Sequence, residues 1–290
     1  RRTPMSRGII FLVHPHREEA KILAKTLAKS LLDSGFTILT TAEIPGAHTL
    51  NDAELRTRRN DVELALVLGG DGTILRGAEL VHGTSIPLLG VNLGHVGFLA
   101  QMGKPSAEML VKTIVEKSYI TERRMTLSYK VERDDGTVTQ GWALNEVTVE
   151  RNTEAMIELF VQVDHRPLSR WGCDGVICAT PTGSTAYAFS AGGPVVWPDV
   201  EALVLVPLAA HALFSDPMVI SPSAEVAIDV ESETGVLSAD GLRKVSLRLG
   251  DRVTLTSDRS VIHLAHIGEI AFPDRLVAKF KLPVDGWRGE

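Results

Sequence analysis

Cysteine is scarce in this chain, and long apolar runs are missing. Only Cys173 and Cys178 occur among 290 residues, and their spacing matches neither a disulfide framework nor a metal knuckle. We predict that both are small, buried apolar residues. No apolar run reaches the roughly 18 residues that would span a bilayer, and the run at residues 9–13 is too short for a signal-peptide core. The sequence therefore favours a cytoplasmic protein with no membrane partner.

An excess of basic residues is also missing. The formal net charge is −6 and the pI is about 5.9, which argues against a nucleic-acid partner because phosphate backbones favour clustered Lys and Arg. The Gly-x-Gly-x-x-Gly fingerprint of dinucleotide oxidoreductases and the Gly-Lys-Ser/Thr ending of the Walker loop are absent as well. These absences weaken the dehydrogenase and P-loop hypotheses.

The length and the apolar content predict two domains, because 290 residues with 44% apolar side chains can bury two cores. In residues 1–121, short apolar runs alternate with helical patterns, as in parallel βαβ units. We predict buried strands at residues 9–13, 36–40, 62–68 and 86–91, and helices at residues 17–33 and 107–115. This half is expected to be a Rossmann-like α/β domain.

From residue 122 the apolar residues alternate with polar ones, which is the pattern of half-buried strands. Asp135-Gly136 supplies a hairpin turn, and further alternation marks strands at residues 157–163, 226–230 and 245–249. We predict a β-rich domain over residues 122–269. A short helix at residues 274–281 follows, and residues 270–290 are expected to return to the first domain.

A glycine turn follows the buried run at residues 62–68. Gly69, Gly70, Asp71, Gly72 and Thr73 lie between that strand and a helical pattern. Glycines permit positive φ and a close approach of the backbone, and the following helix N-terminus attracts anions, so a phosphate is the expected ligand. A carboxylate there would repel phosphate, so Asp71 is predicted to receive a proton from an alcohol during phosphoryl transfer. The alternative is a turn that only caps a helix.

A second polar segment begins at Cys173. Thr180, Thr182, Ser184, Thr185 and Ser190 supply hydroxyls with few charges, a set suited to a ribose, an amide or an adenine edge. Thr182 or Ser184 could cap a short helix ending near Ala191. Tyr187 could stack on a base or be a core tyrosine, and Asp174 could hold a sugar hydroxyl or close a turn with Gly175.

Asn145 and Glu146 interrupt the strand-like run at residues 142–149. Successive side chains of a strand face opposite sides, so one of the two must face inward and needs partners or a ligand. The alternative is an exposed edge strand.

Taken together, and in this order, the glycine turn, Asn145-Glu146, Asp174-Gly175 and the block at residues 180–187 resemble the signature of the NAD kinases, which use ATP or polyphosphate. The resemblance extends from about residue 60 to the end. The tail at residues 272–276, with Gly286-Trp287-Arg288, resembles actinobacterial members. The glycine turn alone is less specific, because lipid kinases and phosphofructokinases resemble it.

The resemblance implies a Rossmann-like N-terminal domain, a β-rich C-terminal domain, a nucleotide cleft between them, and a homodimer or homotetramer. It implies that Asp71 accepts the proton of the adenosine-ribose 2′-hydroxyl of NAD, with Gly72 and Arg76 near the phosphates. Gly69, Gly70 and Thr73 would form the phosphate-donor loop, and Asn145, Glu146 and Asp174 would hold ribose and base groups. The adenine or nicotinamide pocket would be lined by Thr185, Ala186, Tyr187, Ala188, Phe189 and Ser190, with Ala209 and His211 nearby. Magnesium is expected to arrive with the triphosphate, without protein ligands.

Two departures and two alternatives accompany this assignment. Gly172 stands where some family members carry a basic residue, and the turn at residues 238–241 resembles a second Asp-Gly element in looser surroundings. The sequence assigns no role and no metal pair to His14, His16, His48, His82, His95, His165, His263 and His266. A non-catalytic NAD(H) sensor and a lipid or sugar kinase are the competing functions. The choice between ATP and polyphosphate, the use of NADH, the subunit number and feedback regulation are left open.

Overall fold

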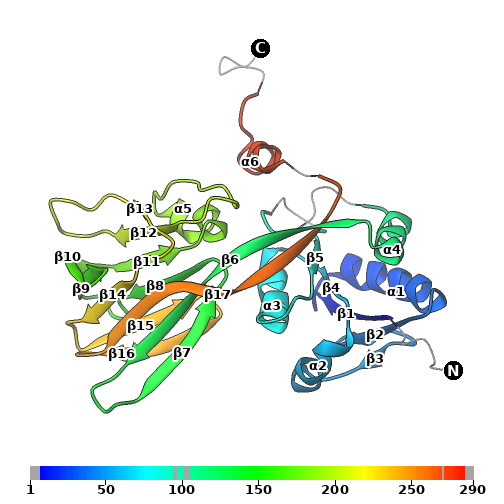
Figure 1. The fold of residues 1–290 in the computed structure, drawn as a ribbon, viewed down its shortest axis with the longest axis horizontal. Helices are drawn as coiled ribbons and strands as arrows, with labels where there is room; N and C mark the ends of the chain where they lie inside the picture. The colour runs from blue at the N-terminus through cyan, green and yellow to red at the C-terminus, as the bar shows by residue number, and fades with distance from the viewer. Residues whose placement is uncertain (1–6, 94–96, 101–104, 270, 285–290) are drawn as a thin grey trace. The chain divides into compact units, whose positions relative to one another are not determined.

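The structure is a computed structural model that describes residues 7–93, 97–100, 105–269 and 271–284. The chain divides into two compact units: unit 1 is Arg1–Arg123 with Ile262–Glu290, and unit 2 is Arg124–Val261. We predicted boundaries after residues 121 and 269. The chain passes between the units inside two long strands, β6 (Tyr119–Glu132) and β17 (Arg252–Ile267) (Figure 1). An alternation that continues without a break gives no local sign of a boundary.

Unit 1 is built on a parallel sheet with the strand order β5-β4-β1-β2-β3. Its strands are β1 (Arg7–Val13), β2 (Phe36–Thr40), β3 (His48–Thr49), β4 (Leu64–Leu68) and β5 (Leu88–Val91), and Leu264 and Ala265 of β17 pair in parallel beside β5. The central strand β4 is buried along its whole length, as expected of a sheet covered on both faces. The predicted Rossmann-like α/β architecture is confirmed.

Helices cover both faces of this sheet. Helices α1 (Glu18–Asp33) and α4 (Ala107–Glu116) pack their apolar stripes on one face, together with Phe11 and Leu66. Helix α3 (Asp71–Val81) lies on the other face, where Gly77 contacts Leu12, Val67 and Leu88 so closely that a Cβ would fall 2.8–3.2 Å from their side chains. Helix α6 (Phe272–Phe280) also belongs to unit 1.

One helix of unit 1 was not predicted from the sequence. Helix α2 (Asp52–Arg58) is followed by the 3-10 turn η1 (Arg59–Asp61), and Leu55 is its one buried residue. A helix with so small an apolar stripe gives no 3.6-residue period. The local sign was the capping box, in which Asn51 and Glu54 exchange hydrogen bonds of 2.9 and 2.8 Å.

Unit 2 is mostly β structure, as predicted. One sheet has six strands in the order β13-β12-β11-β8-β15-β16, with β13 (Met218–Ile220), β12 (Leu203–Leu208), β11 (Gly175–Ala179), β8 (Glu146–Glu150), β15 (Thr234–Ala239) and β16 (Arg243–Arg248). The other strands follow the order β10-β9-β14-β17, with β6 and β7 continuing beside β17; these are β10 (Arg166–Cys173), β9 (Ile157–Val163), β14 (Val226–Val230) and β7 (Val138–Ala143).

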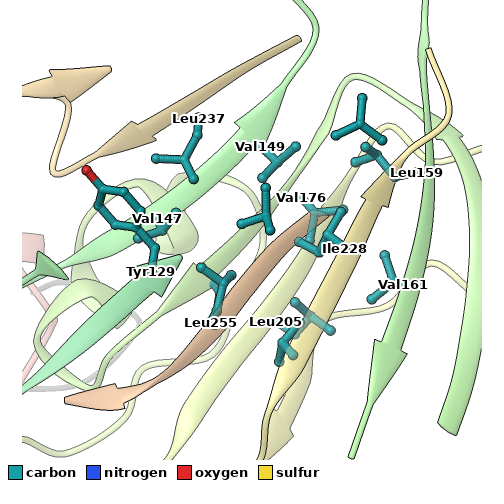
Figure 2. Close-up of a cluster of buried hydrophobic side chains, with 14 of the residues drawn as sticks. Tyr129, Val147, Val149, Leu159, Val161, Val176, Leu205, Ile228, Leu237 and Leu255 are labelled. Atoms are coloured by element: carbon teal, nitrogen blue, oxygen red, sulfur yellow. The ribbon is translucent and has the colours of Figure 1, made fainter. Parts of the chain in front are cut away.

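The core of unit 2 is filled from both groups of strands. Val149 and Leu237 of the six-stranded sheet belong to the same buried cluster as Leu159, Ile228 and Leu255 of the other group (Figure 2). Cys173 and Cys178 are free and buried in this cluster, which confirms their prediction as apolar core residues. Burial raises the pKa of Cys173 to about 11 and that of Cys178 to about 12.

A smaller cluster covers part of the opposite face of the six-stranded sheet. The turn η2 (Thr182–Thr185) and the single-turn helix α5 (Tyr187–Ser190) follow β11, and Ala188 packs there with Ala179 and Val206. No side-chain hydrogen bond caps either turn, so neither Thr182 nor Ser184 has the capping role we predicted. Among the described residues, no helix is long and apolar enough to cross a membrane.

Candidate active site

The glycine turn lies where the strand order of unit 1 reverses. The chain moves from β1 outward to β2 and β3, then returns to place β4 and β5 on the other side of β1. The carboxyl ends of β1, β4 and β5 meet at this point, because the N–H of His14 donates to Leu68 O (3.0 Å) and the N–H of Gly69 donates to Val91 O (3.0 Å). Ligands of open α/β sheets bind at such switch points, so the turn lies where this fold binds ligands.

The glycines of the turn provide space rather than an unusual backbone. Glycines permit positive φ, but none of Gly69, Gly70 and Gly72 has it, and Gly70 caps α3 with an extended backbone (φ −84°). A Cβ on Gly69 would fall 2.5 Å from Thr73 Oγ1, whereas a Cβ on Gly70 or Gly72 would meet nothing within 4 Å. Gly69 is therefore required for packing on the helix, and the surface beside Gly70 and Gly72 is open to a ligand.

Asp71 is the first residue of α3, and its carboxylate is held by a segment that follows β5. Oδ2 accepts from the N–H of Phe98 (3.1 Å) and Oδ1 accepts from the N–H of Leu99 (3.3 Å). Gly97 lies close to the same carboxylate, since a Cβ on Gly97 would fall 2.3 Å from Oδ1. Each carboxylate oxygen has a second lone pair, so Asp71 can still accept a proton from a ligand. The segment at residues 97–99 was not predicted, because Gly97 lies six residues after the end of β5, whereas Gly69 follows β4 directly.

Basic side chains gather at the same edge of the sheet. Arg76 is exposed on α3, and its charge, with those of Arg17 and His16, adds to the desolvation that lowers the pKa of His14. His14 and Arg17 follow β1 directly, so they share the β1–β4 switch point with the glycine turn. The charges of Arg17 and Arg76 give the edge a positive potential that favours an anionic ligand. We assigned no role to His14 from the sequence, because a lone histidine carries no pattern.

In unit 2, Asn145 and Glu146 lie at a bend. The predicted single strand at residues 142–149 is wrong: β7 ends at Ala143 and β8 begins at Glu146 in the other sheet. Asp240 holds the bend by accepting from the N–H groups of Leu144 (2.8 Å), Asn145 (2.7 Å) and Glu146 (3.3 Å). The Asp-Gly element at residues 238–241 thus positions Asn145 and Glu146.

Glu146 is buried, and its Oε2 has no hydrogen-bond partner among the described residues. Burial raises its pKa to about 8, and the negative charges of Asp240 and Glu150 add to the effect. The alternative of an exposed edge strand is therefore wrong at this residue. A carboxyl that keeps its proton at neutral pH can donate a hydrogen bond to an acceptor of a ligand.

This shifted pKa predicts the pH dependence of stability. The folded protein retains a proton on Glu146 that the unfolded chain releases between pH 4.5 and about 8, so the free energy of unfolding falls as the pH rises through this window. Glu146→Gln is expected to remove that slope. Above pH 8 its free energy of unfolding should exceed that of the wild type by on the order of a few kcal/mol. Urea unfolding at several pH values measures this. Glu158→Gln, on an exposed carboxylate of β9, is the matched control, and a slope that survives in Glu146→Gln would contradict the assignment.

Tyr187 lies near the acidic side chains of Glu150, Asp174 and Glu146. The hydroxyl of Tyr187 donates to Glu150 Oε1 (2.9 Å), and desolvation and this bond raise its pKa to about 12. Tyr187 is 42% exposed, so the alternative of a core tyrosine is wrong and the ring is available for stacking. Asp174 Oδ1 pairs with Arg151 Nε at 2.6 Å, and both remain partly exposed.

The buried hydroxyls after β11 have structural partners. Thr180 Oγ1 donates to Leu144 O (2.5 Å) and Ser184 Oγ donates to Pro181 O (2.7 Å), while Thr182 Oγ1 accepts from Arg124 (3.2 Å). A Cβ on Gly183 would lie 2.0 Å from Asn145 O. The expectation that all these hydroxyls face a ligand is therefore corrected, because Thr180 and Gly183 bind the bend that carries Asn145.

The next residues divide between surface and core. Tyr187, Phe189 and Ser190 are exposed, Thr185 and Ala186 are half-buried, and Ala188 is fully buried, so the side chain of Ala188 packs inward. Ala209 is exposed with a positive φ of 47°. It lies beside Asp174, whose N–H donates to Leu208 O (2.9 Å). A left-handed backbone on a residue other than glycine is strained and often marks a ligand contact.

The side chains of the candidate site were also compared with the ligands that a metal ion needs. Over the described residues, no set of three His, Cys, Asp or Glu side chains could hold a metal ion. Both oxygens of Asp71 are engaged by N–H groups. Magnesium commonly binds through substrate phosphates and waters with few protein carboxylates, and this donor set fits an ion that enters with a triphosphate. His95 and residues 286–288, named in the sequence analysis, lie outside the described residues.

Comparisons with known proteins agree with these motifs. Residues 9–119 match the family model "ATP-NAD kinase N-terminal domain" and residues 144–267 match "ATP-NAD kinase C-terminal domain". The NAD kinase of Thermobifida fusca is 46% identical over 98% of this chain and 92% of its own length, and that of Leifsonia xyli is 53% identical over 79% and 77%. An NAD kinase from Archaeoglobus fulgidus in complex with ATP has a TM-score of 0.69 at 28% identity, covering 89% of this chain and 92% of its own. Yeast NADH kinase with NADH, at 22% identity over 99% and 91% of the two chains, shares the fold with a TM-score of 0.89. This chain therefore belongs to the NAD kinase family.

Proposed function

We propose that this member of the NAD kinase family transfers the terminal phosphoryl group of ATP to the 2′-hydroxyl of the adenosine ribose of NAD, which produces NADP and ADP. One observation carries the proposal. The carboxylate of Asp71 stands at the start of α3, oriented by two N–H groups, beside glycines that leave open space. That arrangement suits a base that receives an alcohol proton next to a phosphate chain.

The reaction needs little covalent participation by the protein. The ribose oxygen forms a bond to the γ-phosphorus while the bond from that phosphorus to the β-phosphate oxygen breaks, and ADP leaves with the electron pair. Asp71 takes the hydroxyl proton late in this step, because the transition state of phosphoryl transfer is loose. A magnesium ion bound to the triphosphate would neutralise part of its charge. Arg76, with Arg17 nearby, would attract the same anion.

Unit 2 supplies the groups proposed to hold the dinucleotide. Asn145 and Glu146 on their bend, with Asp174, would bind ribose and base groups, and the exposed ring of Tyr187 would stack on a base. Thr185, Ala186, Phe189, Ser190 and Ala209 complete the proposed contacts, while Ala188 contributes through the backbone. We also propose that the enzyme acts in the cytoplasm as a homodimer or homotetramer, with polyphosphate as an alternative donor.

A product assay tests the function. The protein is incubated with NAD and ATP plus magnesium, and the dinucleotides are separated by chromatography and assayed with an NADP-specific dehydrogenase. We expect NADP to form with one ADP per product. Crossing NAD and NADH against ATP and polyphosphate identifies the donor and acceptor. Tight binding of NAD without product would instead support the sensor, and ATP consumption that does not depend on NAD would support a lipid or sugar kinase.

A further inference from the structure

The C-terminal helix α6 places a buried arginine against the segment that holds Asp71. Arg275 is 2% exposed, and its Nη1 donates to the carbonyl oxygens of Phe98 (3.1 Å) and Ala100 (2.6 Å). A charge this deeply buried is costly unless it is fully hydrogen-bonded. Two of its bonds go to one short backbone segment, so the position of that segment and the position of Arg275 depend on each other.

The guanidinium is itself held from its other side. Nη2 of Arg275 lies 3.2 Å from Nδ1 of His266, and Nε2 of His266 lies 3.1 Å from Oε2 of Glu122. A guanidinium only donates, so Nδ1 is the acceptor and the ring proton is on Nε2, facing the carboxylate. His266 on β17 therefore fixes the direction of Arg275 and is fixed in turn from β6.

Aromatic contacts hold the same segment against α6. The ring of Phe98 lies 6.0 Å from that of Phe272 and 5.8 Å from that of Phe280, in tilted arrangements. These spacings are those of favourable aromatic pairs. Helix α6 thus contacts Phe98 in two ways. The residues at its two ends pack on the ring of Phe98, and Arg275 between them donates to its carbonyl.

One peptide group connects Arg275 to the carboxylate. The carbonyl of Phe98 accepts from Arg275, and the N–H of the same peptide plane, that of Leu99, donates to Asp71 Oδ1. The peptide is planar and rigid, so turning its carbonyl also turns its N–H. A hydrogen bond from a cation to the carbonyl also polarises the group and strengthens the donor at its other end.

We propose that Arg275 is a positioning residue for phosphoryl transfer: through the Phe98–Leu99 peptide it fixes the direction of the Asp71 carboxylate toward the substrate hydroxyl. The proposal rests on the proposed function of Asp71 as the proton acceptor. Arg275 itself touches neither the carboxylate nor the reacting atoms. Its loss should therefore affect the chemical step and leave the binding of NAD intact.

The first test is Arg275→Met, with steady-state kinetics for NAD and calorimetric titration of NAD. We expect kcat to fall by about 10-fold to 100-fold, since small misplacements of a reacting group have effects of that size, and KM and Kd for NAD to stay within about threefold. Arg275→Lys should recover part of kcat, because an ammonium can still donate to the carbonyls. Arg7→Met is the matched control: Arg7 also donates to two backbone carbonyls, of Ile114 and Val115, but has no bond to the segment at residues 97–100.

The second test is a double-mutant cycle with Asp71→Asn. If Arg275 acts through Asp71, adding Arg275→Met to Asp71→Asn changes kcat by no more than about twofold, whereas independent effects would multiply. Multiplying losses, or an Arg275→Met variant as active as Arg7→Met, would overturn the proposal. An Asp71→Asn variant with wild-type kcat would remove the proposed base instead. If Arg275→Met does not fold, His266→Gln takes its place in the cycle. We expect His266→Gln to lower kcat by a smaller factor, and we again expect it to change the kcat of Asp71→Asn by no more than about twofold.

Discussion

Asp71→Asn is expected to lower kcat by about 10²-fold to 10⁴-fold, the usual contribution of a positioned acid or base. Asparagine has nearly the same shape but cannot take up the proton of the ribose hydroxyl. One of the two N–H groups that bind the carboxylate, those of Phe98 and Leu99, would also lose its acceptor. NAD binding should persist, because the residues proposed to hold the dinucleotide lie in unit 2. Initial rates of NADP formation and calorimetric titration of NAD measure the two quantities.

The matched control is Asp61→Asn. Asp61 is exposed in η1 and forms a surface ion pair with Arg58 at 3.4 Å, a contact that contributes little to stability. Its variant should have the kcat of the wild type. Equal rates for Asp71→Asn and Asp61→Asn would mean that the proton leaves the hydroxyl by another route.

Gly97→Ala is expected to lower kcat by about 10²-fold, because a displacement of about 1 Å of a reacting group has an effect of that size. The added Cβ would lie 2.3 Å from Asp71 Oδ1 and 2.6 Å from its Cγ, so the carboxylate must move. The obstacle is the end of a side chain rather than backbone, and the fold should therefore absorb the methyl group with little loss of stability. In this variant kcat should therefore fall while the thermal stability stays close to that of the wild type.

Kinetics and thermal unfolding together check this separation. Gly172→Ala is the control, since its methyl group would meet only Met156, at 3.8 Å. Its kcat and Tm should both resemble those of the wild type. If Gly97→Ala keeps full activity, the carboxylate does not need the position it has here. If it loses its fold together with its activity, the contact matters for packing rather than for the reaction.

Local patterns predicted much of the fold. The strands β2, β9 and β14 have the predicted bounds, because β2 is a short apolar run and in β9 and β14 apolar residues recur at every second position. The split of residues 142–149 into β7 and β8 could not be predicted in this way. Asp240 causes it by binding the N–H groups of Leu144 and Asn145 from 96 and 95 positions away, and no window of neighbouring residues contains that information.

The candidate site shows the same division between local and distant information. Asp71 was identified because a strand, three glycines and a helix are contiguous. The groups that orient it were missed, since Leu99 and Arg275 belong to separate parts of the chain. For a different reason, the sequence could not show whether the glycines of the turn are needed for positive φ or for space. A glycine that is needed for space, such as Gly69 beside Thr73, has the same letter as one that is needed for its backbone.

The two long strands β6 and β17 also limit how this enzyme can be altered. Each runs without interruption through a unit boundary, after Arg123 in one case and after Val261 in the other. Removing either unit would cut both β6 and β17 within their length and expose backbone groups that are paired in the intact sheet. The two halves are thus unsuited to be exchanged as modules between proteins, and a new specificity has to arise from substitutions within the intact chain.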